Sequence, residues 1–214
     1  MREQLTDLRS TRNPKARIKI MEGHFATVNS HINTYIDMST VKCRHNNGRE
    51  TARVLAEHFR NNTMVDTIVC LDGTEVIGAF MAEFLSDRGI MSINSGNNIS
   101  IITPDVNAYG QLVFMDSTIR MIKNMQVLVL AASVTTGRTI AQAAEAVSYY
   151  GGTVGGVAAI FSNVEQTPEE MEIFSIFHKE DLPDYQAYQP SECPMCRRKQ
   201  PLDAIVNSFG YSKL

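Results

Sequence analysis

A loop at residues 135–139 has the residue types and the spacing to bind a phosphate group. It consists of Thr135, Thr136, Gly137, Arg138 and Thr139, which offer three hydroxyl donors and one guanidinium. The glycine allows the backbone to close around an anion, and a following helix would add free amides and partial positive charge. The arginine contributes charge if its side chain turns inward. A Walker-type loop is excluded because no Gly-Lys-Ser/Thr follows at the required spacing.

The same loop also fits an ordinary helix start without any ligand. Thr135 or Thr136 could cap the helix, because threonine is a good N-cap residue, and Gly137 would be tolerated just after it. The residue types alone leave both interpretations open.

A second polar turn, formed by Asp72, Gly73, Thr74 and Glu75, follows an apolar run farther upstream. Carboxylates beside phosphates can hold Mg²⁺ or accept hydrogen bonds from a ligand. Alternatively, Asp72 shapes the turn and Glu75 favours a helix N-terminus. Tyr35 has a similar ambiguity: it can stack on a base, or it can be a half-buried tyrosine of a strand.

Apolar periodicity supplies the elements that must position these loops. Helical and strand patterns alternate: helix at 48–60, strand at 66–71, helix at 76–85, strand at 127–130, helix at 140–147, strand at 154–161. This alternation predicts an α/β fold with a parallel sheet and right-handed crossovers. The loop at 135–139 would then lie at the carboxyl end of a strand, where ligands bind in such sheets.

The remaining segments carry weaker patterns. Residues 89–126 indicate a hairpin or a mobile loop, and the polar segment from residue 165 onward resembles a wrapped tail. We therefore expect one domain over residues 1–214, with a core at 48–162 and with hood and tail elements at 1–47 and 163–214.

Composition limits the classes of partner. The net charge of −3 and the pI near 6.0 lack the basic excess that nucleic acid attracts, so no nucleic-acid partner is expected. The charged N-terminal stretch does not resemble a secretory signal, and no apolar run approaches the ~20 residues that cross a bilayer. We expect a cytoplasmic protein without a membrane partner.

The four cysteines do not form a secreted disulfide framework, but two of them have zinc-knuckle spacing. A closed zinc site needs four ligands, so Cys193 and Cys196 would require a second chain, Cys43, Cys70 or a histidine nearby. The alternative is a plain turn. The five histidines have neither triad nor zincin spacing, and the sequence assigns no metal ligand and no catalytic residue.

The sequence VLVLAASVTTGRT resembles the phosphoribosyl-diphosphate signature of type I phosphoribosyltransferases, and LDGTEVIG resembles the pyrophosphate loop of the same family. GHFATVNSHINTYID and YQPSECPMCRRKQPLD resemble segments of the orotate phosphoribosyltransferase branch. The resemblance thus covers nearly the whole chain.

The resemblance implies a type I phosphoribosyltransferase fold, with a five-stranded parallel sheet flanked by helices under a small hood. It also implies a homodimer, to which the many methionines could contribute an adaptable contact surface. The implied reaction, a step of pyrimidine biosynthesis, joins orotate to phosphoribosyl diphosphate with Mg²⁺ and releases pyrophosphate.

Three departures from the family pattern fall where this chemistry would occur. The two acidic residues that hold the ribose hydroxyls in the family are Ala131 and Ala132 here. A lysine typical of the orotate enzymes is replaced by Val28, and the Ser-Gly pair after it by Asn29 and Ser30.

The third departure concerns the family's mobile loop, which brings basic residues to the leaving pyrophosphate. Residues 89–119 contain no lysine, arginine or histidine. We therefore predict a protein that binds a ribose phosphate or nucleotide with impaired orotate transfer. The alternative is a non-catalytic paralogue that senses a nucleotide or phosphoribosyl diphosphate.

Overall fold

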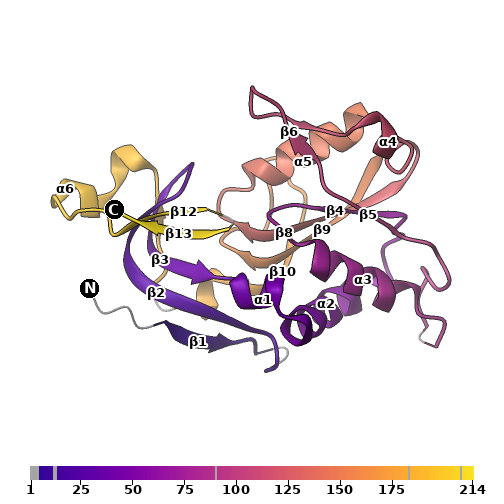
Figure 1. The fold of residues 1–214 in the computed structure, drawn as a ribbon, viewed down its shortest axis with the longest axis horizontal. Coiled ribbons are helices and arrows are strands. Elements are labelled where there is room, and N and C mark those ends of the chain that lie inside the picture. The colour runs from indigo at the N-terminus through magenta and orange to yellow at the C-terminus, as the bar shows by residue number, and fades with distance from the viewer. Residues whose placement is uncertain (1–4, 12–13, 90, 183, 208) are drawn as a thin grey trace.

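The computed structural model describes residues 5–11, 14–89, 91–182, 184–207 and 209–214. These residues form a parallel core sheet, an antiparallel-rich hood sheet and a small hairpin, seen on the right, on the left and at the top of Figure 1.

The core sheet has five strands in the order β10-β9-β8-β4-β5, and every neighbouring pair is parallel. Its strands are β4 (Thr67–Cys70), β5 (Ser100–Ile102), β8 (Gln126–Val134), β9 (Thr153–Ser162) and β10 (Phe174–His178). The central strands are apolar and buried on both faces, as parallel sheets require. The parallel α/β core predicted from the sequence is confirmed.

Helices cover both faces of this sheet. Helices α2 (His45–Phe59) and α3 (Glu75–Ser86) lie on one face, and α5 (Arg138–Tyr149) lies on the other (Figure 1). Side chains alternate along β8: Leu128 and Leu130 belong to the first core cluster, while Val127 and Val129 pack in the cluster that includes α5. Of the described helices, none is long and apolar enough to cross a membrane.

The hood sheet combines both ends of the chain. Its strand order is β11-β3-β2-β12-β13, and β1 pairs with β2 beside this path. The strands are β1 (Thr6–Arg9), β2 (Arg17–Ala26), β3 (His31–Asp37), β11 (Ala187–Tyr188), β12 (Ala204–Asn207) and β13 (Gly210–Lys213). Because β12 pairs with β2 and β11 pairs with β3, the C-terminal tail completes a sheet that the N-terminal hairpin begins.

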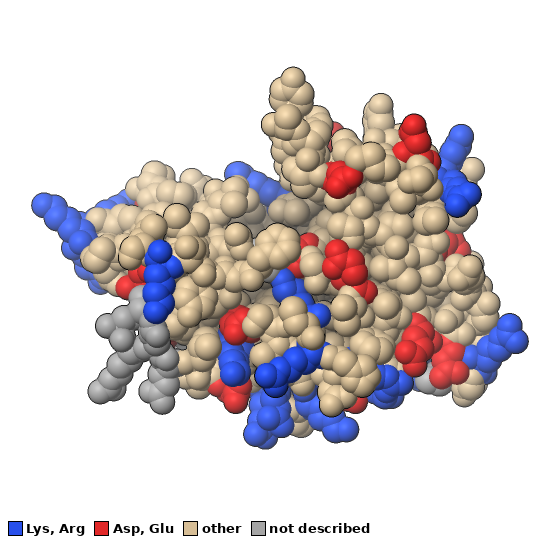
Figure 2. All heavy atoms as spheres, in the orientation of Figure 1, with Lys and Arg blue, Asp and Glu red and all other residues tan. Residues whose placement is uncertain are grey.

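The segment at 89–126 contains the hairpin that its turns indicate, formed by β6 (Asp105–Val106) and β7 (Leu112–Val113). It also contains β5 and the single-turn helix α4 (Asp116–Ile119), which are too short to give a periodic signal. The tip of the hairpin projects above α5 in Figure 1, and Figure 2 shows it without charged side chains on the visible face.

The short remaining elements connect the core and the hood: α1 (Ser39–Cys43), two 3₁₀ turns η1 (Lys179–Asp181) and η2 (Pro190–Glu192), and α6 (Pro194–Arg197). Strand β10 lies in the range 163–214 that we assigned to hood and tail, yet it forms the edge of the core sheet. Its five residues follow a polar, proline-containing stretch, and this context hid the apolar strand in the sequence.

Candidate functional site

A pocket with a cavity volume of about 260 Å³ lies where the hood meets the carboxyl end of the core sheet. The loop between β2 and β3, the end of β8 and the loop at 135–139 form its walls, and Tyr185 and Asn207 also line it. Phosphate-loop residues and the hood therefore face one shared cavity. This is the position at which open parallel sheets bind their ligands.

The segment at 135–139, predicted as a loop, spans the start of α5: Arg138 and Thr139 are the first two residues of the helix. Gly137 is the N-cap residue of this helix, with φ of 78°, and the structure shows no side-chain hydrogen bond that caps it. The described residues therefore do not support a simple threonine cap. The first amides of α5 and the partial positive charge of the helix point into the pocket region, which suits an anion.

Neighbouring segments fix the shape of this loop. The Asn163 amide donates a hydrogen bond from Nδ2 to the Thr135 carbonyl oxygen at 3.2 Å, and its backbone N–H donates to the Val134 carbonyl at 2.8 Å. Tyr185 hydrogen-bonds to the Thr135 side chain, and burial raises the pKa of this tyrosine to about 12. These contacts hold the loop in position before any ligand arrives.

Gly137 is also constrained by packing. A Cβ atom at this position would lie 3.1 Å from Pro168 Cδ and 3.2 Å from Thr167 Cα. Both the left-handed backbone and the lack of space therefore require glycine here.

The turn at 72–75 lies beside this loop, with consecutive residues in the left-handed region. Asp72 has φ of 59° and Gly73 has φ of 74°. A non-glycine residue in this region is uncommon and is often found at binding sites. The carboxyl group of Asp72 lines the pocket and accepts a hydrogen bond from the Ala132 backbone. Burial raises its pKa above the ordinary value, although nearby Lys42 and this hydrogen bond oppose the shift.

Lys42 of α1 reaches over this turn. Its Nζ donates a hydrogen bond to the Asp72 carbonyl oxygen at 2.8 Å and would lie 3.8 Å from a Cβ atom at Gly73. Burial lowers the pKa of Lys42, and Asp72 is the first of several acidic groups that oppose this shift. No local pattern identifies Lys42 as a site residue, because it lies in a five-residue helix whose contact with the turn depends on the fold.

The other two predicted residues of the turn have different surroundings. The hydroxyl of Thr74 is buried and donates to the carbonyl oxygens of Leu71 at 2.8 Å and Leu130 at 3.2 Å, which ties β4 to β8. Glu75 is exposed and accepts a hydrogen bond from Thr103 at 2.9 Å. Neither side chain lines the main pocket, so Asp72 is the member of this turn placed to meet a ligand there.

The two alanines of β8 lie beside the ligand loops and are almost fully buried. Ala131 lines the main pocket, and Ala132 lines an adjoining cavity of about 40 Å³ that Lys42 also borders. Among the described residues that line the main pocket, Asp72 is the one carboxylate and Arg138 the one cationic side chain. The described lining of the pocket is thus mostly apolar or uncharged polar.

Tyr35 lies on the hood wall of the pocket, but most of its side chain is buried against other residues of the hood. It is 6% exposed, and its ring lies 6.0 Å from the ring of Phe25 and 5.2 Å from the ring of Tyr211. Burial raises its pKa to about 12, helped by Asp37 and Tyr211. Its role in base binding remains a prediction.

Sequence comparison with curated proteins finds orotate phosphoribosyltransferases, and no family model matches the chain. The enzyme of Chlorobaculum parvum is 25% identical over 198 residues, which cover 86% of this chain and 88% of the relative.

Solved phosphoribosyltransferases have a similar fold. A phosphoribosyltransferase from Corynebacterium diphtheriae aligns with a TM-score of 0.54 and 18% identity, covering 75% of this chain and 90% of that one. The orotate phosphoribosyltransferase of Mycobacterium tuberculosis H37Rv, in complex with 5-phospho-α-D-ribosyl 1-diphosphate, aligns with a TM-score of 0.51 and 18% identity, covering 70% and 83%. The fold and the resemblance expected from the sequence are confirmed.

Proposed function

We propose that this protein binds the ribose phosphate of phosphoribosyl diphosphate or of a nucleotide, and that it transfers the ribosyl group to orotate slowly or not at all. The observation that carries the proposal is the contrast within one pocket. The segment at residues 135–139 opens onto it at the N-terminus of α5, while Ala131 in this pocket and Ala132 in the adjoining cavity stand where the family resemblance implies acidic side chains.

Binding would use groups that are already in position. Amides at the start of α5 and the hydroxyls of Thr135, Thr136 and Thr139 would donate to the phosphate oxygens, and Arg138 would supply charge if it turns inward. Hydrogen bonds to a charged group contribute about 1.5–3 kcal/mol each, so a few of them support micromolar affinity.

Transfer would lack two kinds of electrostatic support. Positive charge develops on the ribosyl ring in the transition state, and the alanines at 131 and 132 cannot balance it. Negative charge develops on the departing pyrophosphate, and residues 89–119 offer no cation to receive it. Each such loss commonly lowers the rate by ~10²-fold or more. Lys42 is the nearest candidate for a cation at the turn, but it is already bonded to the Asp72 carbonyl oxygen.

The lining of the pocket offers too few ligands to hold Mg²⁺ before a phosphate compound binds. Such ions are usually bound through one or two carboxylates together with substrate phosphates. Asp72 is the single carboxylate among the described lining residues, and the ammonium group of Lys42 lies beside the same turn. Any Mg²⁺ would therefore have to arrive on the ligand, and no step of this proposal depends on the metal.

A second candidate function, that of a sensor without turnover, is favoured by the same two alanines. Such a protein would bind phosphoribosyl diphosphate or a nucleotide without converting it. We also expect a homodimer in the cytoplasm by analogy with the family. Light scattering tests the dimer, because a single species of 23.8 kDa at micromolar concentration would contradict it.

Calorimetry with a panel of ligands tests the proposed function. The panel contains phosphoribosyl diphosphate, orotidylate, orotate and purine nucleotides, each with and without Mg²⁺. We expect binding of at least one ribose 5-phosphate compound and much weaker binding of free orotate. If no compound with a ribose 5-phosphate binds at millimolar concentration, the proposal is wrong.

A further inference from the structure

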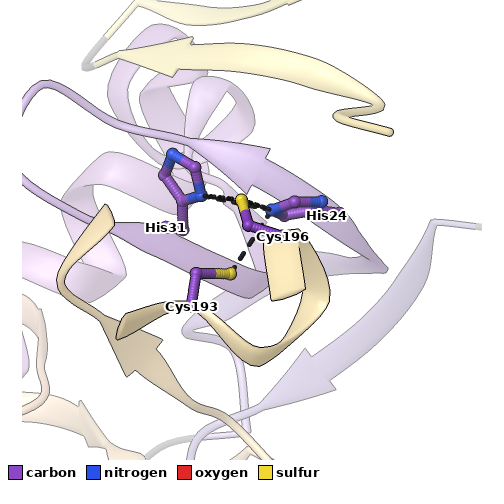
Figure 3. A group of neighbouring side chains, drawn as sticks. All are labelled: His24, His31, Cys193 and Cys196. Carbon is purple, nitrogen blue, oxygen red and sulfur yellow. Dashed lines mark hydrogen bonds between the residues drawn. The ribbon is translucent and has the colours of Figure 1, made fainter. Parts of the chain in front are cut away.

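We propose that His24, His31, Cys193 and Cys196 bind one Zn²⁺ ion, which joins the C-terminal tail to the hood. The four side chains converge in Figure 3, two from the hairpin of β2 and β3 and two from the turn that contains α6. Their ligand atoms all lie within 4.8 Å of one another. The two histidines supply the partners that the CxxC pair lacks in the sequence.

Four of the six distances between the ligand atoms match the edges of a tetrahedron around zinc, and the other two are within 4.8 Å. Bond lengths of ~2.3 Å to sulfur and ~2.0 Å to nitrogen give edges of ~3.6 Å between nitrogen and sulfur and ~3.3 Å between two nitrogens. His24 Nε2 lies 3.5 Å from Cys193 Sγ and 3.6 Å from Cys196 Sγ. His31 Nδ1 lies 3.3 Å from Cys196 Sγ and 3.2 Å from His24 Nε2.

The hydrogen bonds of His24 leave its Nε2 atom as a ligand. Its Nδ1 atom lies 3.0 Å from the Gln200 carbonyl oxygen and 3.2 Å from that of Pro201. Carbonyl oxygens only accept, so Nδ1 carries the proton and Nε2 carries a lone pair. Metal-bound histidines usually donate the N–H of their other ring nitrogen to a carbonyl or carboxylate oxygen, as His24 does here.

One lone pair cannot account for all the contacts of His24 Nε2. Three atoms approach it within 3.6 Å: His31 Nδ1, Cys193 Sγ and Cys196 Sγ. One hydrogen bond satisfies this lone pair, so the other two atoms lie close to Nε2 without bonding to it, even where His31 Nδ1 and Cys196 Sγ, 3.3 Å apart, bond to each other. A cation at the centre of the four atoms satisfies all of them at once, with both cysteines as thiolates.

The position of the cluster allows an ion to enter and then remain. His24 and Cys193 are fully buried, His31 is intermediate and Cys196 is exposed, so the site is closed on one side and open on the other. Two thiolates and two imidazoles in a tetrahedron favour zinc over Mg²⁺ or Ca²⁺, which prefer oxygen ligands.

The hood hairpin brings the two histidines together: His31 pairs with Ala26, and His24 lies two residues before Ala26 along β2, which the pleat of a strand places on the same face. The pairing of β2 and β3 shifts between Glu22 and Phe25, and this irregularity includes His24. A bulge of this kind redirects side chains. Asp203 of the tail also binds the backbone of His24. Its Oδ2 accepts a hydrogen bond from the His24 N–H at 2.8 Å, and its own N–H donates to the His24 carbonyl oxygen at 2.8 Å.

The zinc site would stabilise one wall of the ligand pocket. The pocket-lining loop from Thr27 to Ser30 lies between the two histidines along the chain. The tail continues from Cys196 into β12, whose Val206 and Asn207 also line the pocket. Loss of the ion would therefore loosen the hood wall while leaving the parallel core in place.

Metal analysis of the full-length protein, expressed with zinc and then desalted, tests the proposal. We expect about one zinc per chain in the wild type and a fall to nearly none in Cys196→Ser and His31→Ala. Cys43→Ser is the matched control, because Cys43 is also an exposed free cysteine but lies outside the cluster. Equal zinc content in Cys43→Ser and Cys196→Ser would overturn the assignment.

Cobalt provides a readout that does not depend on the variants folding well. Reduced, metal-free wild-type protein titrated with Co²⁺ should develop the strong visible bands of a tetrahedral thiolate site, and Zn²⁺ should then displace the cobalt. The proposal is wrong if reduced protein takes up neither metal, or if Cys193 and Cys196 are recovered as a disulfide from zinc-supplemented reducing cells.

Discussion

The two sides of the ligand pocket differ in how well they are equipped for chemistry. On one side, the loop at 135–139 has its glycine, its hydroxyls and a helix N-terminus, all held by contacts from Asn163 and Tyr185. On the other side, β8 has two buried alanines at positions 131 and 132, near its carboxyl end, and the hairpin segment carries no basic residue between 89 and 119. In the proposed function, the first side binds the phosphate, whereas the second lacks the charged side chains that would stabilise charge developing during transfer.

This difference teaches that ground-state binding and transition-state stabilisation can be lost separately on one scaffold. A phosphate already carries its charge before reaction, so a preformed loop contributes to affinity alone. Acidic and basic groups around the ribosyl centre act mainly on charges that appear later. The expected results below test each side of the pocket in turn.

The largest effect is expected from Gly137→Val on the phosphate side. The substitution places a β-branched side chain at φ of 78°, against Pro168 and Thr167, so the loop must move. Backbone strain of about 1–3 kcal/mol together with lost phosphate contacts should weaken phosphoribosyl-diphosphate binding ~10²-fold or more, measured by calorimetry.

Gly110→Val is the matched control, because Gly110 also has φ of 78° but has no atom within 4 Å of an added Cβ. It should destabilise the hairpin and leave affinity nearly unchanged. If both variants lose affinity equally, the loop at 135–139 is not the phosphate site.

The alanine side is tested by Ala131→Asp combined with Ala132→Asp. The carboxylates should recover contacts to ribose hydroxyls or to ligand-bound Mg²⁺. In the presence of Mg²⁺, phosphoribosyl diphosphate should therefore bind ~10-fold more tightly to the double variant than to the wild type. Orotate turnover should remain low, because the hairpin still lacks a cation. Both positions are almost fully buried, so circular dichroism must first show that the variant is folded. A large gain in turnover would show that the alanines alone limit the reaction.

Val28→Lys tests whether a single basic side chain on the hood wall is enough to increase orotate binding. Val28 lines the pocket and is 90% exposed, so a lysine should fit without repacking. A charge-assisted hydrogen bond should increase orotate affinity ~10-fold, measured by calorimetry. Tyr149→Lys is the control, because Tyr149 is 82% exposed on α5 and lies outside the main pocket. Equal gains in both variants would indicate a nonspecific charge effect.

The smallest effect is expected from Asp72→Asn, which tests how much the buried Asp72 carboxylate destabilises the folded protein at neutral pH. Burial raises the pKa of Asp72 above its ordinary value of 3.8, so the folded protein holds the proton more tightly than the unfolded chain. This contribution to stability is present at low pH and is lost as pH rises through the raised pKa. Asp72→Asn should therefore unfold at a higher temperature than the wild type at neutral pH, with the difference vanishing below a pH of about 4.

Thermal scans across pH measure this difference, and Asp105→Asn on the exposed hairpin provides the comparison. A wild type that is more stable than Asp72→Asn at neutral pH would contradict the direction of the pKa shift.

The sequence predicts the core better than the hood. Long apolar runs and periodic helices at 48–60, 76–85 and 140–147 reveal the parallel sheet and the place of the phosphate loop, because these patterns are local. The overlooked strand β10 has five residues, and α1 has five, which is too few for a period to emerge.

The features that the sequence did not predict depend on contacts between segments far apart along the chain. Lys42 meets Asp72 from 30 residues away, and Cys193 meets His24 from 169 residues away. No spacing in the sequence encodes such meetings, since they depend on how the tail returns to the hood. The positions of the loops at 72–75 and 135–139 could therefore be predicted from the sequence, whereas the cysteine and histidine cluster required the fold.

The most direct test of the account compares binding and turnover on one preparation of the wild-type protein. Calorimetry measures phosphoribosyl-diphosphate affinity, and orotate absorbance measures consumption with Mg²⁺ and saturating substrates. We expect micromolar binding with turnover far below the ordinary enzymatic scale of ~1–10³ per second. Turnover within that range would contradict the claim that this pocket binds a ribose phosphate without efficient transfer.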